Sequence, residues 1–251
     1  MEKEKLNQHI TAYQKGFQFF DENTLIIGKF SEFLDEKIKI TLPQNVLSLG
    51  IGYEIVSSTI LKYLKKNVIK KYDIIEGSDA IIKNFLKDNG LSNLDSLNII
   101  HSYFEEFESK TLYDLIEMGF ILEHVDNPHQ ILERYKNFLS PNGVICIGVP
   151  NARSLHRLIG YEAGLLADLY ALSPADIELG HKRYFDLPKI LNLITECGLK
   201  YDNIKGIMLK PITTAQMKTL NFNERLYQAL LKIGKNYPEI SNAIYVEALK
   251  I

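Results

Sequence analysis

This sequence has few cysteines, no long apolar run and no large excess of charge of either sign. The two cysteines, Cys146 and Cys197, are too few for a disulfide scaffold and lack the spacing of a metal site. No stretch approaches the roughly 20 apolar residues that cross a bilayer. The first ten residues are charged rather than apolar, so we predict no signal peptide, no membrane partner and a cytoplasmic protein.

The charge balance argues against nucleic acid as a partner. The chain carries 29 basic and 31 acidic residues, a formal net charge of −2, and its lysines are scattered along the sequence. With 251 residues, 46% of them hydrophobic, it is long enough to bury a sizeable core. We predict one large α/β domain over residues 1–251.

Apolar runs of strand length alternate with segments of helical periodicity, a pattern typical of a parallel sheet covered by helices. The helix that begins at Pro128 is the best defined, because Asp126 and Asn127 are helix-capping residue types. A turn is predicted at residues 140–143. The predicted strands cover 45–50, 72–76, 97–101, 112–120, 144–149, 200–209 and 242–249; the other predicted helices cover 54–66, 80–88, 187–197 and 214–234.

Two segments lie outside this alternation. Residues 1–40 have helical character and are expected to cap one end of the domain. Residues 152–181 predict two helices and no strand, with apolar positions at helical spacing. That apolar face is either an ordinary packing face or a lid over the acceptor pocket.

The candidate ligand site is the glycine turn of residues 49–52, which follows a strand and precedes a helix. Glycine lets the backbone turn sharply there and approach a ligand, but a lone Gly-x-Gly is a weak signal. Glu76, at the end of the next strand, strengthens it, because a carboxylate there can accept hydrogen bonds from ribose hydroxyls. The third glycine of a dinucleotide fingerprint is replaced by Ile55, which favours a nucleoside ligand without phosphates over a dehydrogenase cofactor.

Beyond this motif, the chain resembles the class I S-adenosylmethionine (SAM)-dependent methyltransferases, especially the bacterial group that acts on small molecules and sugar-linked substrates. The resemblance implies a doubly wound, Rossmann-like α/β fold with a seven-stranded, mostly parallel sheet, a helical cap and the strand order 3-2-1-4-5-7-6. It also implies SAM as the cofactor. The matching segments are 46–54, 73–79, 113–128, 139–160 and 180–185.

The resemblance assigns cofactor roles to residues at the ends of the first four strands. Two positions depart from the family pattern: Ser48 stands where the family has an acidic residue that contacts the loop or the cofactor, and Glu54 replaces the third glycine. The implied cofactor contacts are Gly50, Gly52, Met118 and Gly119 at the methionine part, Glu76 at the ribose, and Ser102 and Tyr103 beside the adenine.

Two histidines are candidates for the chemistry. A sulfonium methyl is already activated, so the protein mainly aligns the acceptor, and a general base is needed only for a weakly acidic hydroxyl. His124, after the fourth strand, is either that base, a group that orients the acceptor, or a histidine packed near a helix cap. His181, with Arg183, either faces an anionic acceptor or belongs to a loop salt bridge.

Three further residues are candidates for binding the acceptor. Arg153, His156 and Arg157 form a basic helical face, for which a solvated or ion-paired surface is the default explanation. A phosphate-bearing acceptor would also suit such a cluster, so Arg153 and His156 are kept as candidates. Asn151 ends the fifth strand and can reach the acceptor. We predict no metal, because Asp126, which could join His124 and His129, is better explained as a helix cap.

The sequence therefore predicts O-methylation of a small polar acceptor, either sugar-linked or bearing a phosphate or phosphoramidate, in cell-surface polysaccharide synthesis. One alternative is an N-methyltransferase acting on an amino sugar or amine, which needs only a positioned lone pair. Another is a non-catalytic scaffold on a methyltransferase fold, which Ser48 and Glu54 keep open. The oligomeric state is left open.

Overall fold

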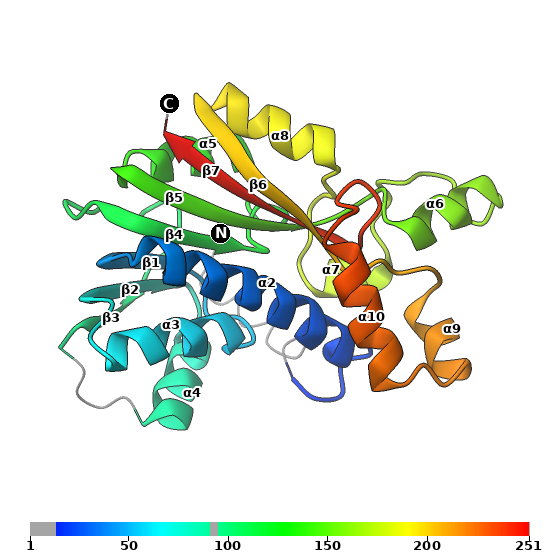
Figure 1. Ribbon diagram of the computed structural model, residues 1–251, viewed down its shortest axis with the longest axis horizontal. Coiled ribbons are helices and arrows are strands. Elements are labelled where there is room, and N and C mark those ends of the chain that lie inside the picture. Colours follow the sequence, from blue (N-terminus) through cyan, green and yellow to red (C-terminus); the bar gives the residue numbers. More distant parts are fainter. Residues whose placement is uncertain (1–13, 91–94, 251) are drawn as a thin grey trace.

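A seven-stranded sheet forms the centre of the computed structural model, which describes residues 14–90 and 95–250 (Figure 1). The strand order is β3-β2-β1-β4-β5-β7-β6, and only β7 runs antiparallel to its neighbours, which confirms the predicted topology. The strands are β1 (Asn45–Leu49), β2 (Lys71–Glu76), β3 (Leu97–His101), β4 (Tyr113–Gly119), β5 (Leu139–Pro150), β6 (Leu199–Ile207) and β7 (Ala243–Lys250).

Helices cover both faces of the sheet, so each central strand contributes to two hydrophobic clusters. Along β1, Val46 faces the cluster beneath α2, α3 and α10, whereas Leu47 and Leu49 face the cluster beneath α5 and α8. This alternation follows from the two-residue period of a strand. The covering helices are α2 (Phe20–Thr41), α3 (Ile55–Lys65), α4 (Asp79–Asn89), α5 (Pro128–Lys136), α8 (Leu187–Glu196) and α10 (Glu224–Gly234).

The predicted start of α5 is confirmed, with Asn127 rather than Asp126 as the capping residue. The Asn127 side chain accepts a hydrogen bond from the Gln130 amide at 3.1 Å, and Pro128 occupies the first turn. The predicted turn at residues 140–143 is wrong: these residues belong to β5 as a bulge, because the register against β4 jumps between Leu139 and Val144. A Pro-Asn-Gly sequence suits a bulge as well as a turn.

The single helix predicted over residues 214–234 is two helices, α9 (Thr214–Thr219) and α10. Asn221 adopts a positive φ of 53°, which a continuing helix does not permit. Asn223 then caps α10 by accepting from the Leu226 amide at 3.1 Å. The helical period continues across the break, so the apolar spacing alone did not reveal it.

The segment predicted as a lid contains two short helices, α6 (Leu155–Glu162) and α7 (Pro174–Glu178), and no strand element. Figure 1 shows α6, α7 and α9 gathered at one end of the molecule, beyond the strands of the sheet. Of the predicted N-terminal cap, α2 packs against α3 and the sheet, whereas residues 1–13 lie outside the described residues. Among the described helices, none combines the length and the apolar character needed to cross a bilayer.

Candidate functional site

A cavity of about 1210 Å³ opens at the edge of the sheet where the parallel strands end. Loops after β1, β2, β3 and β4 form one side of it, and α2, α6, α7 and α9 supply residues to the other. In open α/β sheets, ligands bind at this edge, where the strand order reverses between β1 and β4. The volume accommodates a nucleoside cofactor together with an acceptor.

The glycine turn after β1 forms the floor of this cavity. Gly50 has a φ of +82° and Gly52 a φ of +53°, values that suit glycine because it has no side chain. The Gly50 amide donates to the Ile75 carbonyl at 2.7 Å, which holds the turn against β2. Both glycines line the cavity, and their contact with the methionine part of the cofactor stays a prediction.

Glu76 links the ends of β1 and β2. Its two carboxylate oxygens accept from the Ile51 amide at 3.0 Å and from the Ser78 amide at 2.8 Å. Burial raises the pKa of this carboxyl group, and the backbone amides of Ser78 and Ile51 act in the opposite direction. The carboxylate thus fixes the glycine turn and faces the cavity, where the family's ribose contact is expected.

The two departures from the family pattern do not block the cavity. Glu54 takes a left-handed conformation, φ 62°, at the start of α3, and its side chain accepts from Asn89 at 3.2 Å. Ser48 is buried beneath the turn and contacts the Tyr72 hydroxyl at 2.9 Å. Neither residue lines the cavity, so the cradle for a cofactor keeps its shape.

The remaining predicted cofactor residues divide into two groups. Ser102, Tyr103 and Gly119 line the cavity. The Met118 side chain does not line it: it is fully buried in the hydrophobic cluster on the other face of the sheet, beneath α5 and α8. The sequence placed Met118 at the tip of the strand, but alternation along β4 directs its side chain away from the ligand.

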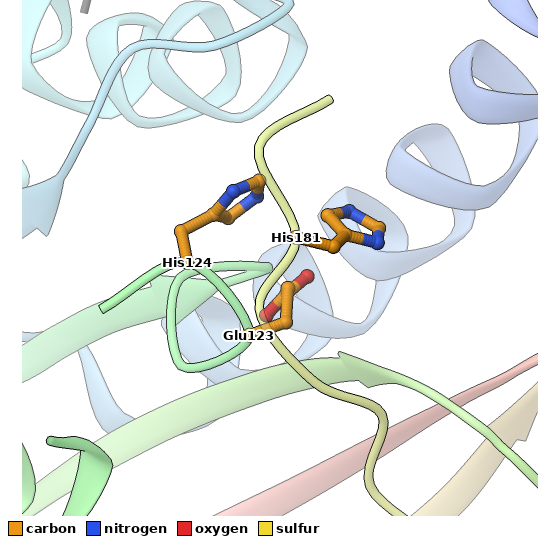
Figure 2. A group of neighbouring side chains, drawn as sticks. All are labelled: Glu123, His124 and His181. Carbon is orange, nitrogen blue, oxygen red and sulfur yellow. The ribbon is translucent and has the colours of Figure 1, made fainter. Parts of the chain in front are cut away.

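Two predicted catalytic histidines lie together. The rings of His124 and His181 are 4.8 Å apart between centroids at an interplanar angle of 74°. Figure 2 shows Glu123 and His124 on the loop after β4 and His181 on a separate segment, with the Glu123 carboxylate pointing toward the two rings. All three residues line the cavity.

The charges around this histidine pair come from two buried acids. Glu123 is fully buried, with no hydrogen-bond partner for either carboxylate oxygen among the described residues. Burial raises its pKa to about 7, while His181 lowers it. On the other side, His181 Nδ1 lies 3.3 Å from Asp176. Burial opposes ionisation of Asp176, but the neighbouring His181 and the hydrogen bonds from Ser173 hold its pKa below the usual range.

Glu123, His124 and His181 also offer ligand atoms that lie within 4.8 Å of one another, a spacing that would suit a divalent cation. Asp126, considered with them in the sequence analysis, instead forms an ion pair with Lys182 at the surface. Our expectation of no metal therefore stays a prediction, and the chemistry of this cluster needs the assay described below.

The four predicted acceptor residues do not form one cationic pocket. Arg153 is exposed and lies outside the cavity lining. Arg183 donates to the Leu122 carbonyl at 3.1 Å and to two other carbonyls of the loop after β4. Asn151 lines the cavity, but it is buried and its amide group donates to the Ser241 carbonyl at 2.8 Å.

His156 does line the cavity, but as a neutral imidazole. Burial, followed by the charges of Lys210 and Arg157, lowers its pKa to about 3. It is therefore unsuited to bind a phosphate by charge, and it is a poor base at neutral pH.

Sequence reasoning missed two polar groups in the cavity. Glu117 interrupts the apolar run of β4, a signal that could have been noticed. Lys210 forms a buried ion pair with Glu22 at 2.6 Å and donates to Thr214 at 2.9 Å. Glu22 lies 188 residues before Lys210 in the chain, so no local sequence pattern predicts their contact.

A Rossmann-like sheet of this strand order, a glycine turn after β1 and a carboxylate ending β2 together define a class I SAM-dependent methyltransferase. The chain belongs to the methyltransferase domain family, whose model matches residues 20–204. The protein is thus an enzyme that uses SAM as its methyl donor, and the scaffold alternative is set aside.

Two sequence relatives share one enzyme name. The ubiquinone biosynthesis O-methyltransferase of Rickettsia canadensis is 23% identical over 185 residues, covering 73% of this chain and 72% of its own. The mitochondrial enzyme of that name from Dictyostelium discoideum is 24% identical and covers 67% of this chain and 54% of its own. These relatives give no support to the polysaccharide context that the sequence analysis favoured.

Solved structures confirm the fold. The plantazolicin methyltransferase BpumL in complex with SAH has a TM-score of 0.60 at 18% identity and covers 99% of this chain and 95% of its own. The N-methyltransferase NodS from Bradyrhizobium japonicum in complex with SAH has a TM-score of 0.60 at 9% identity, covering 98% and 97%. At such identities the likeness shows the fold alone.

Proposed function

We propose that this enzyme transfers the methyl group of SAM to a hydroxyl oxygen of a small molecule with a substantial apolar part. The observation that carries the proposal is the pair of histidine rings beside the buried Glu123, facing the cavity. The relatives named O-methyltransferases support the choice of oxygen. A role related to ubiquinone biosynthesis replaces the polysaccharide context in this proposal.

The lining of the cavity supports an apolar acceptor without phosphate. Ile159, Leu165 and Leu166 contribute apolar side chains from the lid segment. Lys210 is already paired with Glu22. Arg153 and Arg183 lie outside the lining. Of the other cations that line it, Arg157 donates to the Leu169 and Ala171 carbonyls and Lys182 is paired with Asp126. We continue to expect a small molecule rather than a nucleic acid as the acceptor.

In the proposed mechanism, His124 takes the proton of the acceptor hydroxyl as the oxygen attacks. Held by Gly50, Gly52 and Glu76, the cofactor would supply a methyl group already activated by its sulfonium and would leave as a neutral thioether. Glu123 and Asp176 place negative charge beside the two histidines and stabilise an imidazolium. The lid excludes water from the reacting atoms.

The test is an acceptor screen with mass-spectrometric detection of methylated products, using hydroxylated aromatic compounds with apolar tails alongside matched amines. His124→Asn is expected to lower kcat roughly 100-fold with the best hydroxyl acceptor, because it removes the base. His129→Asn is the matched control, since His129 is exposed on α5 and outside this cavity. Full activity in His124→Asn, or methylation of the amines alone, would favour the N-methyltransferase alternative. Loss of activity on chelation, restored by a divalent cation, would assign the cluster to a metal instead.

A further inference from the structure

Glu117 is a carboxylic acid within an otherwise apolar strand. It is 4% exposed and lies on β4, two residues before the strand ends at Gly119. It also lines the cavity, unlike its neighbour Met118. A buried acid in a central strand is costly unless it has partners or a function.

Glu117 lies beside a position on the neighbouring strand β1 where the family's acidic residue is missing. In the parallel register of β1 and β4, Glu117 lies directly beside Ser48, the position at which the family has an acidic residue. The Ser48 hydroxyl hydrogen-bonds to the Glu117 carboxylate. The acid that β1 lacks is therefore present one strand away, on the same face of the sheet.

The carboxylate of Glu117 is directed toward the cavity edge of β4. Its Oε1 accepts from the Gly119 amide at 2.7 Å. A side chain at position 119 would collide with this oxygen, at 2.8 Å, and with Phe30 of α2, at 2.6 Å. Gly119 thus leaves room for the acid to reach the end of its own strand.

The order of groups along the sheet edge indicates which part of the cofactor meets Glu117. Glu76 ends β2, the glycine turn follows β1, and Glu117 lies on β4, so the turn separates the two acids. If Glu76 holds the ribose, the methionine part extends across the turn toward β4. That part ends in an ammonium and a carboxylate, and its ammonium is the natural partner of an acid.

We propose that Glu117 binds the α-ammonium group of the methionine part of SAM, taking the place of the acidic residue missing at position 48. Binding then draws Glu117 into its ionised form. In the free protein, burial raises the pKa of Glu117 to about 8, against the hydrogen bonds from Gly119 and Ser48. At neutral pH the group is mainly protonated, so cofactor binding releases a proton.

Among the residues that the structure describes, no cation forms an ion pair with Glu117. Lys37 on α2 forms an ion pair with Glu247 on β7 at 2.5 Å, and the other lysines of α2 are paired with Glu32 and Asp35. The hydroxyl of Tyr245 donates to the same Glu247 at 2.9 Å. The other titratable side chains that interact with Glu117 are Tyr72 on β2 and Cys146 on β5.

The experiment is calorimetric titration of wild type and Glu117→Gln with two ligands, S-adenosylhomocysteine and 5′-methylthioadenosine. The second ligand lacks the amino-acid part. The amide keeps the acceptor for Gly119, so we expect correct folding but roughly 10- to 100-fold weaker binding of S-adenosylhomocysteine. Affinity for methylthioadenosine is expected to change less than twofold. Wild type should release a proton on binding S-adenosylhomocysteine at pH 7, seen as a dependence of the enthalpy on the buffer, and Glu117→Gln should release less.

Two further variants keep the test decisive. Glu54→Gln is the matched control, an acid beside the same turn that does not line the cavity, and should bind both ligands normally. Ser48→Asp combined with Glu117→Ser should recover part of the lost affinity by restoring the family arrangement. Equal weakening of both ligands in Glu117→Gln, or no weakening of either, would overturn the proposal. Should Glu117→Gln fail to fold, Glu117→Asp is compared on the same two ligands.

Discussion

Glu54 shows how a residue can depart from a family motif without altering the site. It sits at the position of the third family glycine and adopts the positive φ, 62°, that glycine takes without strain. For other residues the left-handed conformation costs about 1–2 kcal/mol. The side chain turns outward to Asn89, so the substitution affects stability rather than the cofactor.

We therefore expect Glu54→Gly to be more stable than Glu54→Ala by about 1 kcal/mol, because only glycine relieves the positive φ. Both variants lose the hydrogen bond to Asn89, so the pair isolates the backbone effect. Chemical denaturation measures the free energy of unfolding, and calorimetry should find unchanged affinity for S-adenosylhomocysteine. Equal stability of the two variants would refute the strain.

At the same scale, the sequence predicted some site residues better than others. Gly50, Gly52 and Glu76 were predictable because a strand end, a turn and the next strand end are local features. Arg183 was not, since its three backbone partners lie about 60 residues away. The neutral state of His156 also depends on burial that only the folded chain creates.

Among the elements, the strands were predicted more accurately than the connections. The third strand was predicted with its observed bounds, Leu97–His101, because apolar runs bounded by polar residues are clear signals. The bulge at residues 140–143 and the break before α10 were missed. Both depend on register and packing against other elements rather than on local preference.

Arg157 contributes several contacts within the segment that we propose as a lid. Arg157 on α6 donates to the Leu169 carbonyl at 2.8 Å and to the Ala171 carbonyl at 2.7 Å. Its guanidinium also lies 4.3 Å from the centre of the Tyr184 ring. A planar group with several donors is suited to this task, and lysine cannot reproduce it.

Arg157→Lys should consequently loosen the lid and raise KM for the acceptor roughly 10-fold, while affinity for S-adenosylhomocysteine stays within twofold of wild type. Arg153→Lys is the matched control from the same segment, because Arg153 is exposed and outside the cavity. Steady-state kinetics and calorimetry supply the two measurements. If Arg153→Lys raises KM and Arg157→Lys does not, the acceptor role predicted from the sequence for Arg153 regains support.

On the scale of the whole molecule, the cavity lies between the ends of the parallel strands and a group of helices. The strand ends supply the glycine turn, Glu76 and Glu117, whereas α2 and the helices beyond the sheet supply the side that we propose for the acceptor. In the free protein, Glu117 lacks the ammonium group of SAM that we propose as its partner. The stability of the free protein should therefore depend on pH through this group.

The pKa of Glu117 is raised from 4.5 to about 8 in the folded chain, so between these values the folded state holds a proton that the unfolded state has released. The stabilisation is complete below about pH 4.5 and is lost as the pH rises through about 8. His156, whose pKa is lowered from 6.5 to about 3, acts in the opposite direction, but its effect is complete above pH 6.5.

Between pH 6.5 and 8, we therefore expect the free enzyme to lose roughly 1–2 kcal/mol of stability through Glu117. Thermal denaturation in buffers of matched ionic strength should show Tm falling by a few degrees over this range. In Glu117→Gln the decline should be smaller, because the amide does not titrate. A decline of the same size in both proteins would mean that other groups cause it. The difference in Tm between the two proteins as the pH rises is the quantity that tests this prediction. A smaller fall in Glu117→Gln would show that ionisation of the buried Glu117 destabilises the free protein.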